Sequence, residues 1–179
     1  MAKQRIEIGD DPRGAALKAA DIFRDGGVVV FPTETVYGIG ALATDARAVE
    51  RLRELKGRAI AKPFQLLVAD MDMAKGMGAV FSSQAARLAR SFWPGPLTLV
   101  VPDGTASGGT LGVRVPDSEF VHALCRELRG AIVSSSANPA GALPPADAAA
   151  ADIFCDAVDL LVDGGPAGGG IPSTGVPCL

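Results

Sequence analysis

Three cations within seven residues are the strongest chemical signal in this 179-residue sequence. Lys56, Arg58 and Lys62 follow the end of a predicted helix and lead directly into an apolar segment. An arginine grips phosphate oxygens through two parallel hydrogen bonds, and a lysine acts as a point charge. The cluster therefore predicts a polyphosphate site. The alternative is that these basic residues only complement the dipole of the helix that they follow.

Small hydroxyl and amide side chains form the second signal. The segment Ser134–Asn138 (SSSAN) comes directly after the apolar residues 131–133. Ligands of open α/β sheets bind beyond the carboxyl ends of the strands, so this segment predicts ligand contacts. A polar turn that prepares for Pro139 is the alternative.

Two further polar features accompany predicted strands. Thr33-Glu34-Thr35 follows the apolar residues 28–31, although a threonine-rich turn is commonplace. Arg114 alternates with Val113 and Val115 on an apolar strand. Because a buried arginine needs a partner, it is either half of an ion pair or faces a cleft that binds an anion.

Several common catalytic arrangements have no support in the sequence. The single histidine, His122, points away from the apolar stripe of its predicted helix at 100° per residue, so we expect it on the surface. Cys125, Cys155 and Cys178 form no CxxC pair, and neither a GxxxxGK[ST] loop nor a GxGxxG after a strand occurs. The clustered hydroxyls and cations instead suit a reaction that is catalysed by positioning and charge neutralisation, as phosphoryl and nucleotidyl transfers are.

Strands and helices that alternate along the chain must position these residues. The pattern predicts a mixed sheet covered by helices, within one domain that spans residues 1–179. The expected helices begin after Asp11, Asp45, Ser82 and Asp117, and Pro32–Gly40 is expected as a loop or irregular strand. The expected strands are residues 5–8, 28–31, 64–69, 97–101, 112–115, 131–134 and 159–162.

Composition indicates the class of protein and its cellular compartment. Apolar residues make up 48% and charged residues 21%, which is typical of a globular chain. The net charge of −3 argues against a surface coated with basic residues for nucleic acid but leaves room for a local basic pocket. The first residues lack the apolar core of a secretory signal, and the apolar runs are too short to span a membrane. We therefore expect a cytoplasmic protein.

The sequence resembles the YrdC-like family over nearly its whole length. Specific motifs carry the likeness, and a weaker one, DGG followed by PST, extends it to residue 174. The resemblance implies an α/β fold with an open, twisted mixed sheet, flanking helices and a concave, locally positive cleft. The matching segments are GGVVVFPTETVYGIGALATD (26–45), LKGRAIAKPFQLLV (55–68), FWPGPLTLV (92–100), VRVPD (113–117) and SSSAN (134–138).

The resemblance also implies an activity, namely synthesis of L-threonylcarbamoyl-AMP from L-threonine, bicarbonate and ATP with release of pyrophosphate. A partner transferase then passes the threonylcarbamoyl group to the adenine beside the tRNA anticodon, so tRNA is an expected partner, met transiently or through that enzyme. Mg²⁺ is expected to arrive with ATP and to be held through phosphates, with no ligand from a protein side chain.

The family's functional residues divide into two sets in this chain. The set implied for threonine and its carbamate is Thr35, Arg114, Ser136 and Ser173. The set implied for ATP is Lys56, Arg58, Lys62, Thr110 and Asn138, with Lys56 and Arg58 also implied in catalysis.

Two positions depart from the family pattern. Leu67 stands where longer members carry a histidine near the threonine, and the family's last ATP-contacting arginine has no counterpart before Leu179. Two other functions stay open from the sequence. One is a domain that handles carbamoyl-adenylate, as in hydrogenase-maturation carbamoyltransferases. The other is a module that binds tRNA or rRNA without catalysis.

Overall fold

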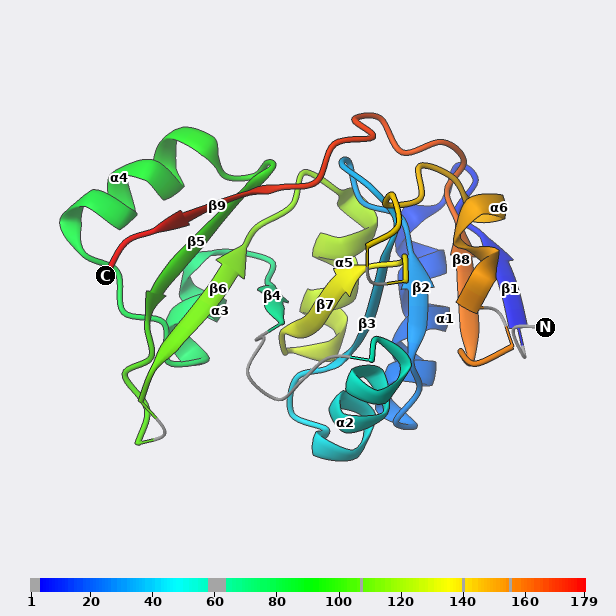
Figure 1. Ribbon diagram of the computed structural model, residues 1–179, viewed down its shortest axis with the longest axis horizontal. Helices are drawn as coiled ribbons and strands as arrows, with labels where there is room; N and C mark the ends of the chain where they lie inside the picture. Colours follow the sequence, from blue (N-terminus) through cyan, green and yellow to red (C-terminus); the bar gives the residue numbers. More distant parts are fainter. Residues whose placement is uncertain (1–3, 58–63, 107, 140, 155) are drawn as a thin grey trace.

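The protein is built around one mixed sheet (Figure 1). The computed structural model describes residues 4–57, 64–106, 108–139, 141–154 and 156–179. Within these ranges nine strands pair in the order β1-β8-β2-β3-β7-β4-β6-β5-β9. The strands are β1 (Gln4–Glu7), β2 (Val29–Phe31), β3 (Gly38–Leu42), β4 (Gln65–Leu67), β5 (Leu97–Pro102), β6 (Thr110–Arg114), β7 (Ile132–Ser136), β8 (Leu160–Asp163) and β9 (Thr174–Pro177). The helices are α1 (Pro12–Arg24), α2 (Ala46–Leu55), α3 (Met71–Gly76), α4 (Ser83–Phe92), α5 (Glu119–Leu128), α6 (Ala148–Ala151) and the 3₁₀ turn η1 (Asp152–Phe154).

The sheet is open and its pairing is mixed, as predicted. The central pairs β2–β3, β3–β7 and β4–β7 are antiparallel, as is β5–β6. The pairs β1–β8, β2–β8, β4–β6 and β5–β9 are parallel. The two described ends of the chain therefore lie at opposite edges of the sheet, on β1 and β9 (Figure 1).

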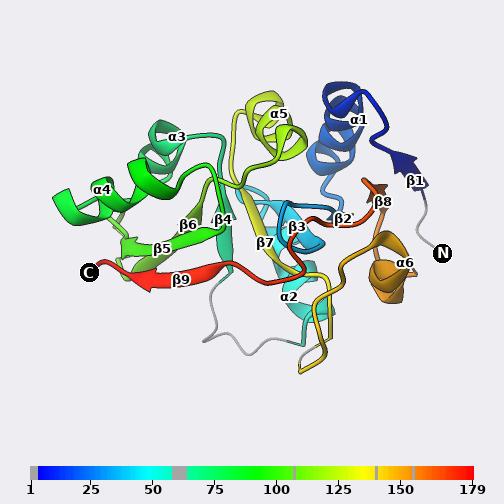
Figure 2. The same ribbon diagram turned by 90° about the horizontal axis from the view of Figure 1, so that it is seen from above.

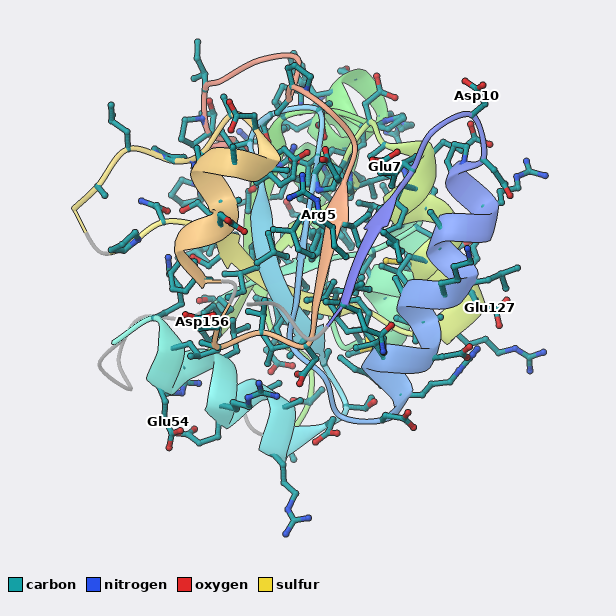
Figure 3. All side chains as sticks on the ribbon, turned by 90° about the vertical axis from the view of Figure 1, so that its right-hand side faces the viewer. Arg5, Glu7, Asp10, Glu54, Glu127 and Asp156 are labelled. Atoms are coloured by element: carbon teal, nitrogen blue, oxygen red, sulfur yellow. The ribbon has the colours of Figure 1, made fainter. Side chains whose placement is uncertain are left out.

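Helices cover both faces of the sheet. Helices α1, α3, α4 and α5 lie on one side, and α2 and α6 lie on the other (Figure 2). The rings of Phe31 and Phe120 join β2 to α5 with their centroids 6.4 Å apart. Glu127 of α5 lies beside α1 and accepts a hydrogen bond of 2.6 Å from Arg24 (Figure 3). Burial of these apolar faces is the main source of stability.

The predicted helix caps are confirmed at three positions. Asp11, Asp45 and Ser82 each accept hydrogen bonds from backbone N–H groups in the first turn of the following helix. The prediction of Asp117 as the cap of α5 was wrong. Ser118 holds that place and accepts from the backbone N–H of Val121 at 3.3 Å, because α5 begins one residue later than expected.

The structure makes one further expectation more specific and corrects another. Residues 38–40, expected in a loop or irregular strand, belong to β3, where a Cβ on Gly40 would lie 2.8 Å from both Ile132 Cγ2 and Val133 O. The absence of a side chain there lets β3 pair closely with β7. His122, expected on the surface, is only partly exposed, and its Nε2 is buried with no hydrogen-bond partner among the described residues.

The described cysteines are structural. Cys125 and Cys178 are free and buried, and burial raises the pKa of the Cys125 thiol to about 12. A thiol with such a pKa is a poor nucleophile near neutral pH. Cys155 lies outside the described residues. Each helix in the part of the chain that the structure describes is too short or too polar to span a membrane.

Residues 164–173 form a connector that crosses from β8 to β9 over the top of the molecule in Figure 1. Its first residues are held by Tyr37, whose hydroxyl donates to Gly165 O at 2.7 Å and accepts from the N–H of Gly164 at 3.1 Å. Asp163 accepts from the N–H of Gly165 at 2.9 Å and from Arg5 at 2.7 Å. These hydrogen bonds, that of Gly165 first, lower the pKa of Asp163.

The lowered pKa of Asp163 predicts a loss of stability in acid. The stabilisation is fully present above the pKa of an unfolded aspartate, about 3.9, and disappears as the pH falls through the lower folded pKa. Denaturant unfolding between pH 6 and pH 3 should show Asp163→Asn to be less stable than the wild type at pH 6. The difference should shrink toward pH 3. Asp72→Asn, at an exposed carboxylate, is the control, and a constant difference for Asp163→Asn would contradict the prediction.

Candidate active site

A cavity of ≈ 250 Å³ lies where several strands of the central sheet begin or end. This volume is below the range of about 300–1,000 Å³ that is common for drug-sized ligands, so it fits a small molecule. The loop between β2 and β3, the strands β3, β4, β6 and β7, and the connector all contribute. The lining residues are Thr33, Thr35, Val36, Gly38, Gln65, Arg114, Ser134, Ser135, Ser136, Pro172 and Ser173. All four residues predicted for threonine and its carbamate are therefore brought together.

Arg114 is the buried cation of this cavity, with 2% of its surface exposed. Its Nη2 donates to Glu34 Oε1 at 2.6 Å and to Thr35 Oγ1 at 3.0 Å, and its Nε donates to Gly95 O at 3.2 Å. The sequence left open whether this arginine forms an ion pair or faces a cleft. It does both, since it pairs with Glu34 and also lines the cavity.

The turn after β2 fixes the hydroxyl groups beside Arg114. The Thr33 hydroxyl donates to Val36 O at 2.7 Å and lies 2.9 Å from the Thr35 hydroxyl. Because a hydroxyl has one proton, Thr35 must donate to Thr33 and can only accept from Arg114. The connector is attached here as well, through the N–H of Gly170, which donates to Thr35 O at 2.8 Å. The Oε2 of Glu34 is buried without a partner in the described ranges.

Lys56 joins the end of α2 to the end of β7. Its ammonium donates to Ser136 O at 2.7 Å and to Asn138 O, and it lies 5.6 Å from the centroid of the Phe154 ring. Only 7% of the residue is exposed. The sequence predicted Lys56 as a cation for a polyphosphate. The structure places its charge against the backbone of the SSSAN segment, at the edge of the cavity that Ser136 lines.

The other residues predicted for ATP are less closely gathered. Asn138 lines a neighbouring hollow of ≈ 340 Å³, where its Nδ2 donates to Ala142 O at 2.6 Å. Its Oδ1 is buried and has no partner within the described chain. Thr110 is exposed at the start of β6, opposite Pro102, and lines neither hollow. Arg58 and Lys62 lie outside the described residues, so the predicted positive charge of the cleft stays a prediction.

Sequence reasoning missed a polar group at the β5 side of the cavity. Thr98 donates to Gln65 Oε1 at 3.0 Å, and its hydroxyl lies 3.0 Å from that of Ser173. The available signal was a single polar side chain inside each of two apolar strands. Leu67 is fully buried, and its carbonyl accepts from the Cys125 thiol at 3.5 Å.

Among the side chains that the structure describes, no group of three His, Cys, Asp or Glu residues could hold a metal ion. A magnesium ion that is bound mainly through the phosphates of a nucleotide needs few protein ligands, so its presence stays an expectation.

The fold and the site define an open-sheet α/β protein with a small polar cavity at its strand ends. The Sua5/YciO/YrdC family model, described as Telomere recombination, matches residues 21–178. The chain therefore belongs to the Sua5/YciO/YrdC family, as the sequence motifs indicated.

Named relatives and a solved structure agree with this assignment. The chain is 38% identical over 164 residues to threonylcarbamoyl-AMP synthase of Pyrococcus abyssi, covering 87% of this chain and 48% of the relative. It is 42% identical over 167 residues to threonylcarbamoyl-AMP synthase of Chromohalobacter salexigens, covering 87% and 88%. The crystal structure of P. abyssi Sua5 complexed with L-threonine matches with a TM-score of 0.88 and 32% identity, covering 97% of this chain and 53% of that one. The chain spans about half the length of the Pyrococcus protein.

The buried ion pair predicts a strongly coupled effect on stability. Arg114→Ala should lower the free energy of unfolding by about 3–5 kcal/mol, because it leaves the Glu34 carboxylate without its counter-ion. Arg114→Met combined with Glu34→Gln should cost less than the sum of the two single changes, in a double-mutant cycle by denaturant unfolding. Arg13→Met with Glu119→Gln, an exposed pair with N and O 3.3 Å apart, is the matched control. Simple additivity at Arg114 and Glu34 would show that the pair is not coupled.

Proposed function

We propose that the chain forms L-threonylcarbamoyl-AMP from L-threonine, bicarbonate and ATP and releases pyrophosphate, acting as a nucleotidyltransferase. The observation that carries this proposal is the convergence of Thr35, Arg114, Ser136 and Ser173 on one small cavity. The names of the relatives and the threonine-bound Sua5 structure support the same ligand.

The geometry supports a reaction that depends on placement. The threonine amine adds to carbon dioxide, which comes from bicarbonate, and loses a proton to form the carbamate. A carbamate oxygen then attacks the α-phosphorus of ATP, and the bond to pyrophosphate breaks. Neither step requires a protein nucleophile. Holding the reactants in line can remove about 7–11 kcal/mol of the barrier.

The residues of the cavity have distinct proposed parts in this reaction. Arg114 binds the threonine carboxylate, held in place by Glu34 and Thr35. Lys56 fixes the carbonyls of Ser136 and Asn138, so that the hydroxyl and amide side chains of the SSSAN segment face the carbamate and the nucleotide. Arg58 and Lys62 are proposed to contact the phosphates, as is Thr110 through its position on β6. Mg²⁺ bound to ATP would offset the charge of the phosphates.

The proposed product is the substrate of a second enzyme. We propose that a threonylcarbamoyl-transferase receives the adenylate and modifies the adenine next to the anticodon, so that contact with tRNA is indirect or transient. The cytoplasm, which holds ATP and tRNA, is the proposed location.

A pyrophosphate assay tests the proposal directly. The chain should release pyrophosphate only when ATP, bicarbonate and threonine are all present, and mass spectrometry should detect threonylcarbamoyl-AMP. Release that depends on carbamoyl phosphate and not on threonine would indicate a carbamoyl-adenylate activity instead. Absence of nucleotide binding, together with salt-sensitive affinity for tRNA, would indicate an RNA-binding module.

Lys56 provides a separate test of the positioning of the SSSAN segment. Lys56→Ala should lower kcat/KM on the order of 100-fold, because the segment loses the cation that holds two of its carbonyls. Arg58→Ala should have a similar effect, and circular dichroism should show both variants folded. Lys75→Ala, which removes an exposed ammonium paired with Asp72 at 3.3 Å, is the control and should keep wild-type rates. Near-normal rates in Lys56→Ala and Arg58→Ala would contradict the assignment.

A further inference from the structure

Three polar side chains from separate segments form a chain of hydrogen bonds at the β5 side of the cavity. Thr98 of β5 donates to Gln65 Oε1 of β4 at 3.0 Å, and its oxygen lies 3.0 Å from Ser173 Oγ of the connector. Thr98 is buried, whereas Gln65 and Ser173 line the cavity. The buried threonine therefore links two residues that a ligand can touch.

The number of available protons sets the direction of each hydrogen bond between these side chains. The oxygen of the Gln65 amide cannot donate, so the single hydroxyl proton of Thr98 is used on it. Thr98 must then accept from Ser173 at their 3.0 Å contact. The proton of Ser173 is therefore also used, and its oxygen can offer a ligand only lone pairs.

The backbone around Ser173 is fixed on both sides. The N–H of Gly170 donates to Thr35 O at 2.8 Å, and the N–H of Thr174 donates to Pro96 O at 2.9 Å. Ser173 is consequently held over the cavity between two anchors. Its hydroxyl presents the same acceptor to each ligand that enters.

The strand order indicates which end of a threonine meets this acceptor. Ser136 and Lys56 lie at the end of β7, whereas Thr98 lies on β5, three strands away across β4 and β6. At about 4.8 Å per strand this separation is roughly 14 Å. Lys56 and Asn138, which are proposed to act on the nucleotide side, meet just beyond β7, so we expect the carbamate to face Ser136. Arg114 of β6 can then take the carboxylate. The side chain of the amino acid is left for Ser173.

We propose that Gln65 and Thr98 are positioning residues that orient Ser173 to accept a hydrogen bond from the side-chain hydroxyl of the substrate. The site then selects amino acids whose side chain donates a hydrogen bond. This inference rests on the proposed function, since it assigns the specificity of the same cavity.

Kinetics with two amino acids of equal shape test the inference. Valine replaces the threonine hydroxyl by a methyl group, and the preference for threonine is the ratio of the two kcat/KM values. Thr98→Val should reduce this ratio by about tenfold, chiefly by raising KM for threonine, because Ser173 loses the acceptor that orients it. Thr98→Ser keeps the hydroxyl and should restore the preference. Thr98→Val with an unchanged ratio, or with equal losses for both substrates, overturns the inference.

The direction of the hydrogen bonds has its own test. O-methyl-L-threonine keeps the side-chain oxygen but cannot donate, so calorimetric titration should show about tenfold weaker binding than threonine to the wild type. Gln65→Leu frees the Thr98 proton to point at Ser173 and should reduce this discrimination. Equal binding of threonine and its methyl ether to the wild type overturns the inference.

The two proposals fail in different ways. Absence of threonine-dependent pyrophosphate release by the wild type overturns the proposed function. Titration of the wild type and Thr98→Val with threonine and valine then decides the inference, because a preference for threonine that the variant loses supports it. A preference that survives in Thr98→Val, or no binding of threonine at all, overturns it.

Discussion

The buried guanidinium of Arg114 constrains three segments of the chain around the cavity. Removing this charge from water is costly unless its donors are satisfied, so the surrounding chain has to supply acceptors. They come from separate segments, namely the Glu34 carboxylate, the Thr35 hydroxyl and the carbonyl of Gly95. The arginine thereby ties β6 to the loop after β2 and to the turn before β5. The wall of the cavity is fixed before any ligand arrives.

Hydrogen bonds between hydroxyl groups fix further parts of the cavity wall. Thr33 and Thr35 form one short chain of hydrogen bonds beside Arg114, and Thr98 and Ser173 belong to another that ends on Gln65. In both chains the proton count sets which atoms can still accept. Dipoles that are oriented in advance need no rearrangement when charge develops, which is the general advantage of a preorganised site. The connector contributes Ser173 to the second chain, and the N–H of Gly170 binds the backbone carbonyl of Thr35, so the connector borders the site as well as joining β8 to β9.

Features that depend on neighbouring residues were predictable from the sequence. Caps such as Asp45 and Ser82 lie next to the helix that they start, and apolar runs such as residues 97–101 mark strands directly. Residues 38–40 were harder, because glycines look like a loop until their partners are known. Gly40 belongs to a strand only because Ile132 and Val133 of β7 lie against it. The prediction that His122 lies on the surface was wrong for the same reason, since helical periodicity does not show which other segments cover a side chain.

The sequence by itself determined the residue types of the site, the alternation of strands and helices, and the family. Thr35, Arg114, Ser136 and Ser173 could be named because their motifs are local patterns of a few residues. Only the tertiary structure decided what these residues touch. Lys56 reaches two backbone carbonyls about 80 positions away, and Thr98 reaches Ser173 across 75. Such contacts depend on strand order and on the path of the connector, and hydrogen-bond direction follows only when every partner is known.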